Sequence, residues 1–188
     1  FLFYEELFFA EDPTTLDKKV KEEQNAHNDK IDHCAKNGLL DLIKDNSEKA
    51  IHNNPVYYIT KVGSIEAEIA MMWTRGRETS YTFTNGLQQT EGGTSLTGVK
   101  TATTLFMKKH IDLEGGKDIV RTGLVYAVAC KIPNPSFANQ TKTKINNAEL
   151  RTICQQATTK ALEEFIIKYP KDFSTIVEFL GRERKAEM

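Results

Sequence analysis

The run from Gly123 to Ile132 constrains the fold of this 188-residue chain more than any other stretch. Its residues from Leu124 to Cys130 are apolar and mostly β-prone, without the polar alternation of a strand that has one face in water. A strand of this composition is buried on both faces of its sheet. We therefore expect a sheet with this strand inside it, and we interpret Cys130 as a core thiol rather than a nucleophile.

Further strands are predicted upstream of this run. Residues 56–59 are β-prone, and residues 65–73 place apolar side chains at every second position, with acids at the first outward positions. The alternation resumes at 79–84 after a turn at 74–77. The sequence therefore predicts an antiparallel hairpin of the strands 65–73 and 79–84.

The first helix expected in the second half of the chain follows a Gly-rich turn at 91–93. Thr94 or Ser95 can cap it, because hydroxyl side chains satisfy the free amides at a helix start. Its inner face carries apolar residues between 96 and 106. A short Gly-rich turn of this kind suits a structural hinge better than a ligand site, although a helix start can bind an anion.

The strongest helical pattern lies near the C-terminus. From Leu150 to Ile166 apolar residues fall at steps of three and four, which is typical of an amphipathic helix. Asn146 or Asn147 can cap its start. At ~1.5 Å per residue this helix is about 30 Å long. A second helix follows, and Gly181 with a charged tail finishes the chain.

The N-terminal part is mostly polar. Residues 1–9 are apolar but short, and we interpret them as a strand or a core-packing tail. Residues 10–54 hold many charged side chains, which favours a solvated surface, with one helical turn or more expected at 38–45. The chain starts with Phe1 and not Met, which fits a piece of a longer protein as well as N-terminal processing.

Composition excludes several classes of function. The net charge of −1 and the pI near 6.5 give no bulk attraction to nucleic acid, so any DNA contact has to come from a local patch. The three cysteines are far apart and form no CxxC pair, and the four histidines form no metal-spaced pair. We expect no zinc site, disulfide framework, secretion signal or membrane span, and a cytoplasmic location.

Six short phrases, in a fixed order and spacing, carry a family resemblance. The chain resembles the transducer domain of the bacterial type IIA topoisomerases, the family of DNA gyrase B and its topoisomerase IV counterpart. The resemblance runs from about Pro55 to the C-terminus. The phrases are Ala70-Met71-Met72-Trp73, Phe83-Thr84-Asn85-Gly86, Glu91-Gly92-Gly93-Thr94, Gly123-Leu124, Pro133 to Lys142, and Lys144 to Leu150.

The resemblance implies a fold and a division into domains. The fold is α+β, a two-layer α/β sandwich of the ribosomal-protein-like or GHMP-kinase-like type, with a mainly four-stranded sheet packed by helices and a long C-terminal helix. Residues 55–188 are the transducer domain, and residues 1–54 are a remnant of, or linker from, a GHKL ATPase domain. Three positions depart from the family pattern: Ser95 replaces His, Thr122 replaces Glu, and Asn139 replaces Gly or Ser.

The resemblance also implies a chemistry. The family changes DNA topology by ATP-dependent double-strand passage, and its GHKL domain holds ATP with Mg²⁺. A loop carrying Gln140, Thr141 and Lys142 enters that site, where Lys142 is the catalytic residue and contacts the γ-phosphate together with Gln140. A lysine ammonium is a compact charge that suits a phosphate oxygen. We expect the chain alone to be inactive and to hold no cofactor of its own.

Double-stranded DNA, a DNA-cleaving subunit of the gyrase A type and a second copy of the same subunit are the partners that the resemblance implies. Phosphate contacts need only positive charge at the right surface. The candidate DNA-binding residues are Lys100, Lys108, Lys109, Arg182, Arg184 and Lys185.

Other interpretations stay open at this point. The resemblance does not separate gyrase from topoisomerase IV, although the helix after residue 93 favours gyrase. A stand-alone α/β module that binds nucleic acid or acts as a small-molecule kinase has the same predicted fold, since fold alone does not determine function. Such a kinase needs its own phosphate loop, for which 91–95 is too short. A scaffold for protein partners is a third possibility.

Overall fold

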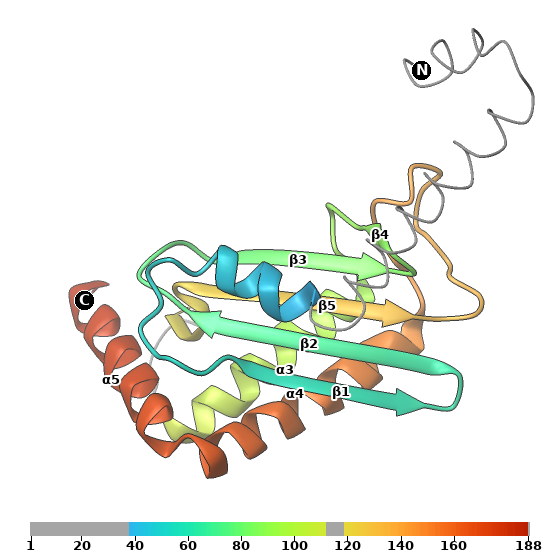
Figure 1. Ribbon diagram of the computed structural model, residues 1–188. Helices are drawn as coiled ribbons and strands as arrows, with labels where there is room; N and C mark the ends of the chain where they lie inside the picture. Colours follow the sequence, from blue (N-terminus) through green and yellow to red (C-terminus); the bar gives the residue numbers. More distant parts are fainter. Residues whose placement is uncertain (1–37, 112–118, 188) are drawn as a thin grey trace, which may run out of the picture. The chain divides into compact units, whose positions relative to one another are not determined.

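Five strands form one mixed sheet in the part of the chain that the computed structural model describes, residues 38–111 and 119–187 (Figure 1). They are β1 (Val56–Val62), β2 (Ile65–Trp73), β3 (Thr79–Thr84), β4 (Leu87–Gln88) and β5 (Leu124–Lys131). Their order across the sheet is β1-β2-β5-β3-β4, and only the β3–β5 pair is parallel. The predictions for residues 1–9, and the parts of the cysteine and histidine predictions that concern residues 27–34, lie outside the described residues.

The α+β class is confirmed, but two details of the predicted sheet are wrong. The sheet has five strands rather than four, because β4 has two residues and is too short to give a periodic signal. The predicted hairpin of β2 and β3 does not form, because β5 lies between these strands. β2 pairs instead with β1 on one side and β5 on the other, and it is buried on both faces toward its C-terminal end.

Gly123 allows the end of β2 to meet the start of β5. The backbone N–H and the hydroxyl of Thr74, just after β2, both donate to the carbonyl oxygen of Gly123, at 2.8 and 2.9 Å. Gly123 has φ +71°, and a Cβ there would collide with the carbonyl oxygen of Thr74. This close approach joins the end of β2 to the start of β5.

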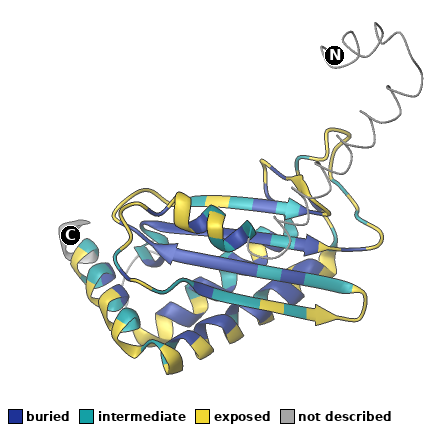
Figure 2. Cartoon of the chain, viewed as in Figure 1, coloured by how far each residue is buried: buried dark blue, intermediate teal, exposed yellow. Residues whose placement is uncertain are grey.

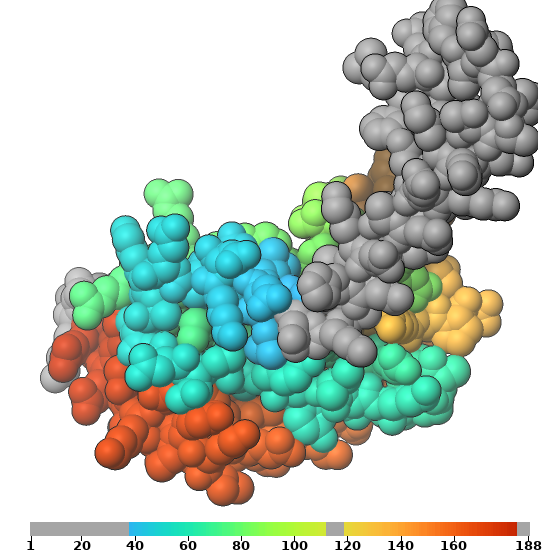
Figure 3. Space-filling model, viewed as in Figure 1, coloured from blue at the N-terminus to red at the C-terminus, as the bar shows by residue number. Residues whose placement is uncertain are grey.

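The two faces of β5 lie in different clusters, as its composition predicts. Leu124, Tyr126 and Val128 belong to the main core, which helices cover from one side. Val125 and Ala127 point to the opposite face, where Leu39 and Ile43 of helix 38–45 pack on them. Figure 2 shows β5 as an almost fully buried strand, and Figure 3 shows helix 38–45, in blue, on the second face.

The main core is closed by α3 (Thr94–His110), α4 (Ala148–Lys168) and α5 (Pro170–Glu187), with a 3₁₀ turn, η1 (Ile119–Arg121), before β5. The long helix is confirmed. Sγ of Cys130 on β5 lies 3.6 Å from Sγ of Cys154 on α4, and both thiols are buried. No helix in the described ranges has the length and apolar character needed to cross a membrane.

The predicted helix ends need correction. The N-cap of α3 is Gly93, whereas Thr94 and Ser95 lie inside the first turn with buried hydroxyls that have no hydrogen-bond partner among the described residues. Asn147 is the N-cap of α4, but its side chain binds the preceding loop instead of the helix amides. α5 continues through Gly181 to Glu187.

His52 links the segment before β1 to the core. Its Nε2 accepts the backbone N–H of Trp73 at 2.9 Å, so the ring is neutral and its Nδ1–H donates to the carbonyl of Asn54 at 2.9 Å. The ring also lies edge-on to Phe165 of α4, with centroids 5.7 Å apart. Burial lowers the pKa of His52, because the charged imidazolium loses its water.

The neutral His52 should make stability depend on pH. Because its folded-state pKa is lowered, its contribution is complete above the unfolded pKa of about 6.5 and is lost as pH falls toward the folded value. His52→Gln should therefore cost about 1–3 kcal/mol of unfolding free energy at about pH 8, and clearly less at about pH 5. Urea unfolding at both pH values measures this.

Thr74→Val is the matched control, since it deletes the two hydrogen bonds of the Thr74 hydroxyl, to the carbonyl of Gly123 and from the amide of Gly76, without a titratable group. Its cost should be the same at both pH values. A His52→Gln cost that does not change with pH would show that His52 is not the neutral acceptor described above.

Candidate functional site

The segment 132–147 between β5 and α4 forms a two-armed loop. Its arms pair through the backbone: Ala138 N–H donates to Lys144 C=O at 2.9 Å, and Asn146 N–H donates to Ser136 C=O at 2.8 Å. Phe137 and Ile145 face each other across this antiparallel bridge. The loop is therefore a short hairpin-like projection rather than an irregular coil. It leaves the sheet at the C-terminal end of β5 (Figure 1).

The Gly-rich turn before α3 holds one arm of this loop. Ile145 N–H donates to Gly92 C=O, and Thr94 N–H donates to Ile145 C=O, both at 3.1 Å. Gly93 has φ +136°, and a Cβ there would collide with the carbonyl oxygen and Cγ2 of Ile145. Two sequence phrases about fifty residues apart thus form one unit. The glycines are needed for close backbone contact, which fits the structural role expected for them.

Asn139 fixes the tip of the loop. Its Oδ1 accepts the backbone N–H of Thr143 at 3.1 Å, and its Nδ2 donates to Oγ1 of Thr143 at 2.7 Å. Lys142 has φ +55°, a left-handed conformation that non-glycine residues seldom adopt. The departure at Asn139 therefore has a structural counterpart, because its side chain closes the turn in which Lys142 adopts this backbone conformation.

Gln140, Thr141 and Lys142 are exposed at this tip. Within the described residues none of the three side chains has a hydrogen bond or a carboxylate partner; Nζ of Lys142 lies 5.9 Å from the ring centroid of Phe137. An amide, a hydroxyl and an ammonium on a fixed turn can together bind an oxyanion. The predicted residues are thus brought together.

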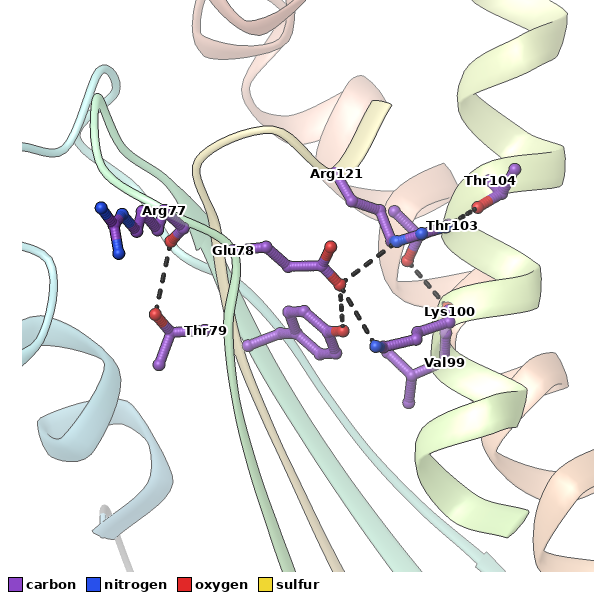
Figure 4. Close-up of polar contacts among 9 residues, drawn as sticks. Arg77, Glu78, Thr79, Val99, Lys100, Thr103, Thr104 and Arg121 are labelled. Carbon is purple, nitrogen blue, oxygen red and sulfur yellow. Dashed lines mark hydrogen bonds and ion pairs between the residues drawn. The ribbon is translucent and has the colours of Figure 1, made fainter. Parts of the chain in front are cut away.

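A second polar cluster lies where the end of the sheet meets α3 (Figure 4). Oε1 of Glu78 accepts the hydroxyl of Tyr126 at 2.7 Å and Nε of Arg121 at 3.2 Å, and Nζ of Lys100 lies 3.4 Å away. Burial, and then the bond to Glu78, raise the pKa of Tyr126. This cluster was not found from the sequence, since Glu78 stands alone in a turn with no motif around it.

The cluster bears on two sequence predictions. Arg121 forms an ion pair with Glu78. It therefore has an acidic partner although position 122 carries Thr instead of the Glu that the family pattern has there. Lys100, a candidate DNA-binding residue, has its ammonium beside Glu78 and its side chain is 39% exposed. Part of its charge is therefore compensated inside the protein, so Lys100 offers a DNA phosphate less net charge than an unpaired lysine does.

The other candidate DNA-binding residues are spread over two helices. Lys108 and Lys109 are exposed in the last turn of α3. Arg182 on α5 is exposed and pairs with Glu178 at 3.6 Å. Arg184 and Lys185 lie within α5, but their side chains are outside the described part. The loop is bonded to the first turn of α3, and the Lys108–Lys109 pair lies in its last turn. These two ends of the helix are about 25 Å apart at ~1.5 Å per residue.

Comparison with known proteins places this arrangement in a family. The family model described as DNA gyrase B matches residues 18–188, so the match starts well upstream of Pro55. The DNA gyrase B protein of Bacillus mycoides is 32% identical over 87% of this chain, which corresponds to 44% of that protein. The Haloferax volcanii protein of the same name is 36% identical over 74% of this chain and 24% of its own length. The chain thus spans less than half of these relatives.

Solved structures agree. The 43K ATPase domain of Thermus thermophilus gyrase B, determined with an aminocoumarin, superposes with a TM-score of 0.71 at 25% identity, over 81% of this chain and 44% of that one. The topoisomerase IV ATP-binding domain of Francisella tularensis superposes with a TM-score of 0.59 over 67% of this chain and 38% of that one. At 22% identity the second likeness concerns the fold alone.

The contact between Gly93 and Ile145 can be tested by substitution. Gly93→Ala should destabilise the chain by more than about 1 kcal/mol, because neither its φ nor the available space accepts a Cβ. The amides of Thr94 and Ile145, which join the loop to the turn, should exchange with solvent faster. Thermal unfolding and amide hydrogen exchange measure the two effects.

Gly181→Ala provides the control, because Gly181 lies in α5 with nothing within 4 Å of an added Cβ. It should stabilise the chain by about 0.5–1 kcal/mol. Equal melting temperatures for wild type and Gly93→Ala would contradict the proposed close contact.

Proposed function

Since the chain belongs to the DNA gyrase B family, we propose that it is the part of an ATP-dependent type II DNA topoisomerase that couples the nucleotide state to movement of the DNA gate. The observation that carries this proposal is the fixed loop tip with exposed Gln140, Thr141 and Lys142. A GHKL ATPase domain would hold most of the ATP and its Mg²⁺. This chain would supply the side chains that approach the terminal phosphate.

The residues present suit a terminal phosphate. Lys142 has an ammonium without a carboxylate partner in the described residues, and Gln140 has an amide N–H₂ that can donate to a second oxygen. A hydrogen bond with a charged partner contributes about 1.5–3 kcal/mol net. In the loose transition state of phosphoryl transfer, charge is spread over the equatorial oxygens of the transferred group and develops on the leaving oxygen, so a fixed cation beside them would lower the barrier. ATP, when bound, would supply the phosphoanhydride bond whose hydrolysis drives the cycle.

The same contact would carry the signal. It exists with an intact triphosphate and is lost after hydrolysis, so it biases the position of this domain by the difference in binding free energy. The arms of the loop continue directly into β5 and α4, and Ile145 is bonded to the turn before α3. A force on the loop tip therefore acts on the main core rather than on a loose connection.

The partners follow from the family. In the complete enzyme we propose a second copy, a DNA-cleaving subunit of the gyrase A type, and double-stranded DNA. The candidate DNA contacts are the exposed Lys108, Lys109 and Arg182, with Lys100 in a supporting role because of its ion pair. The fold type would be that of the transducer domain, residues 55–188, and the corresponding subunit of topoisomerase IV is the alternative within the family.

Lys142→Ala tests the proposal. In the full-length protein that carries this segment, ATP turnover should fall about tenfold to a hundredfold, which corresponds to the loss of one charged hydrogen bond. The melting temperature of the chain should hardly change, because the side chain is exposed. Steady-state ATP hydrolysis and thermal unfolding are the measurements.

Lys144→Ala is the matched control, since Lys144 is an exposed lysine in the same loop but not at the tip. Its ATP turnover should stay near that of the wild type. Unchanged turnover in Lys142→Ala would remove Lys142 from the nucleotide site. Tight binding of ATP by the chain alone would favour the stand-alone kinase-like module instead.

A further inference from the structure

The side chain of Lys142 is held over an aromatic ring of its own loop. Its Nζ lies 5.9 Å from the ring centroid of Phe137, inside the range in which a ring face attracts a cation. Lys142 is otherwise unpaired within the described residues. A flexible lysine stem loses much rotamer freedom when a ligand orders it, so a contact that holds the ammonium beforehand reduces this cost.

The ring is itself fixed. The backbone of Phe137 pairs with Ile145 across the arms of the loop, and its half-buried side chain packs against the main core. The side chain of Asn139 closes the turn from Asn139 to Thr143, within which Lys142 has its left-handed backbone. The ammonium of Lys142 therefore lies over the ring of Phe137, which the fold holds in place. The backbone of the turn that carries Lys142 is held by the side chain of Asn139.

We propose that Phe137 is a positioning residue for Lys142: the face of its ring holds the ammonium at the loop tip before the nucleotide arrives. This inference rests on the proposed function, since the advantage of holding Lys142 depends on the phosphate that it meets. The proposed role requires an aromatic ring, because an aliphatic side chain of similar size would fill the same space without attracting a cation.

The contact can be measured in this chain without nucleotide. An aromatic face shifts nearby protons upfield, so the ε-methylene protons of Lys142 should resonate upfield of those of Lys144, which has no ring contact in the described residues. Phe137→Leu should abolish the difference, and Phe137→Tyr should keep it. Equal shifts for Lys142 and Lys144 in the wild type would overturn the proposal.

A double-mutant cycle then tests the functional part in the full-length protein. Phe137→Leu should lower kcat/KM for ATP about two- to fivefold, the range expected of an exposed cation–π contact. The same substitution in a Lys142→Met background should have no further effect, because the residue acts only through Lys142. Phe137→Tyr should keep kcat/KM within about twofold of wild type, since the ring face is retained.

A failure of the inference about Phe137 can be distinguished from a failure of the proposed function. If Phe137→Leu lowers kcat/KM equally in both backgrounds, the ring acts through the fold and the inference is overturned. If Lys142→Met alone leaves turnover unchanged, the proposed function fails, and the ring-current comparison alone decides whether Phe137 holds the ammonium.

Discussion

The backbone contact between Ile145 and the Gly92–Gly93 turn is the constraint on which the candidate site depends. Through it the loop after β5 is bonded to the start of α3 as well as to its own strand and helix. A free loop of this length would pay a large entropic cost for presenting three polar side chains in one geometry. Here that cost is met during folding, because Ile145 is fully buried and Gly93 accepts an approach that no other residue allows. The geometry of the loop tip therefore depends on Gly93 having no Cβ.

The sequence predicts those parts of this structure that a local pattern encodes. Burial of β5 on both faces follows from its unbroken apolar run, and α4 follows from its spacing of three and four. The pairing of the strands does not follow from such patterns. The separation of β2 from β3 depends on β5, about fifty residues further along, and on the space that Gly123 leaves for Thr74. Strands that follow one another in the sequence are the pairs that a local pattern predicts. Here β5 takes the place beside β2 that the pattern gives to β3.

The site shows the same division. Gln140 and Lys142 could be identified because they stand within a family phrase, although their role remains a proposal. Asn139 and Phe137 could not be assigned a role, because an Asx-type closure and a ring beneath a cation become visible only when the turn is folded. Glu78 is a similar case. Its importance comes from three donors, on α3, η1 and β5, that meet at one carboxylate oxygen.

α3 connects these features physically. Its first turn is bonded to the loop through Thr94, its second turn places Lys100 beside Glu78, and its last turn carries Lys108 and Lys109. α3 packs closely along α4, with Gly98 lying against the backbone of Arg151, so we expect it to respond to a displacement of its first turn as a rigid body. Under the proposed function, a loop tip that follows the terminal phosphate would move the basic end of α3 with it. A charged surface that shifts as a rigid body changes its distance from DNA phosphates without any change in its own contacts, so α3 would by itself be able to link the two proposed ligands.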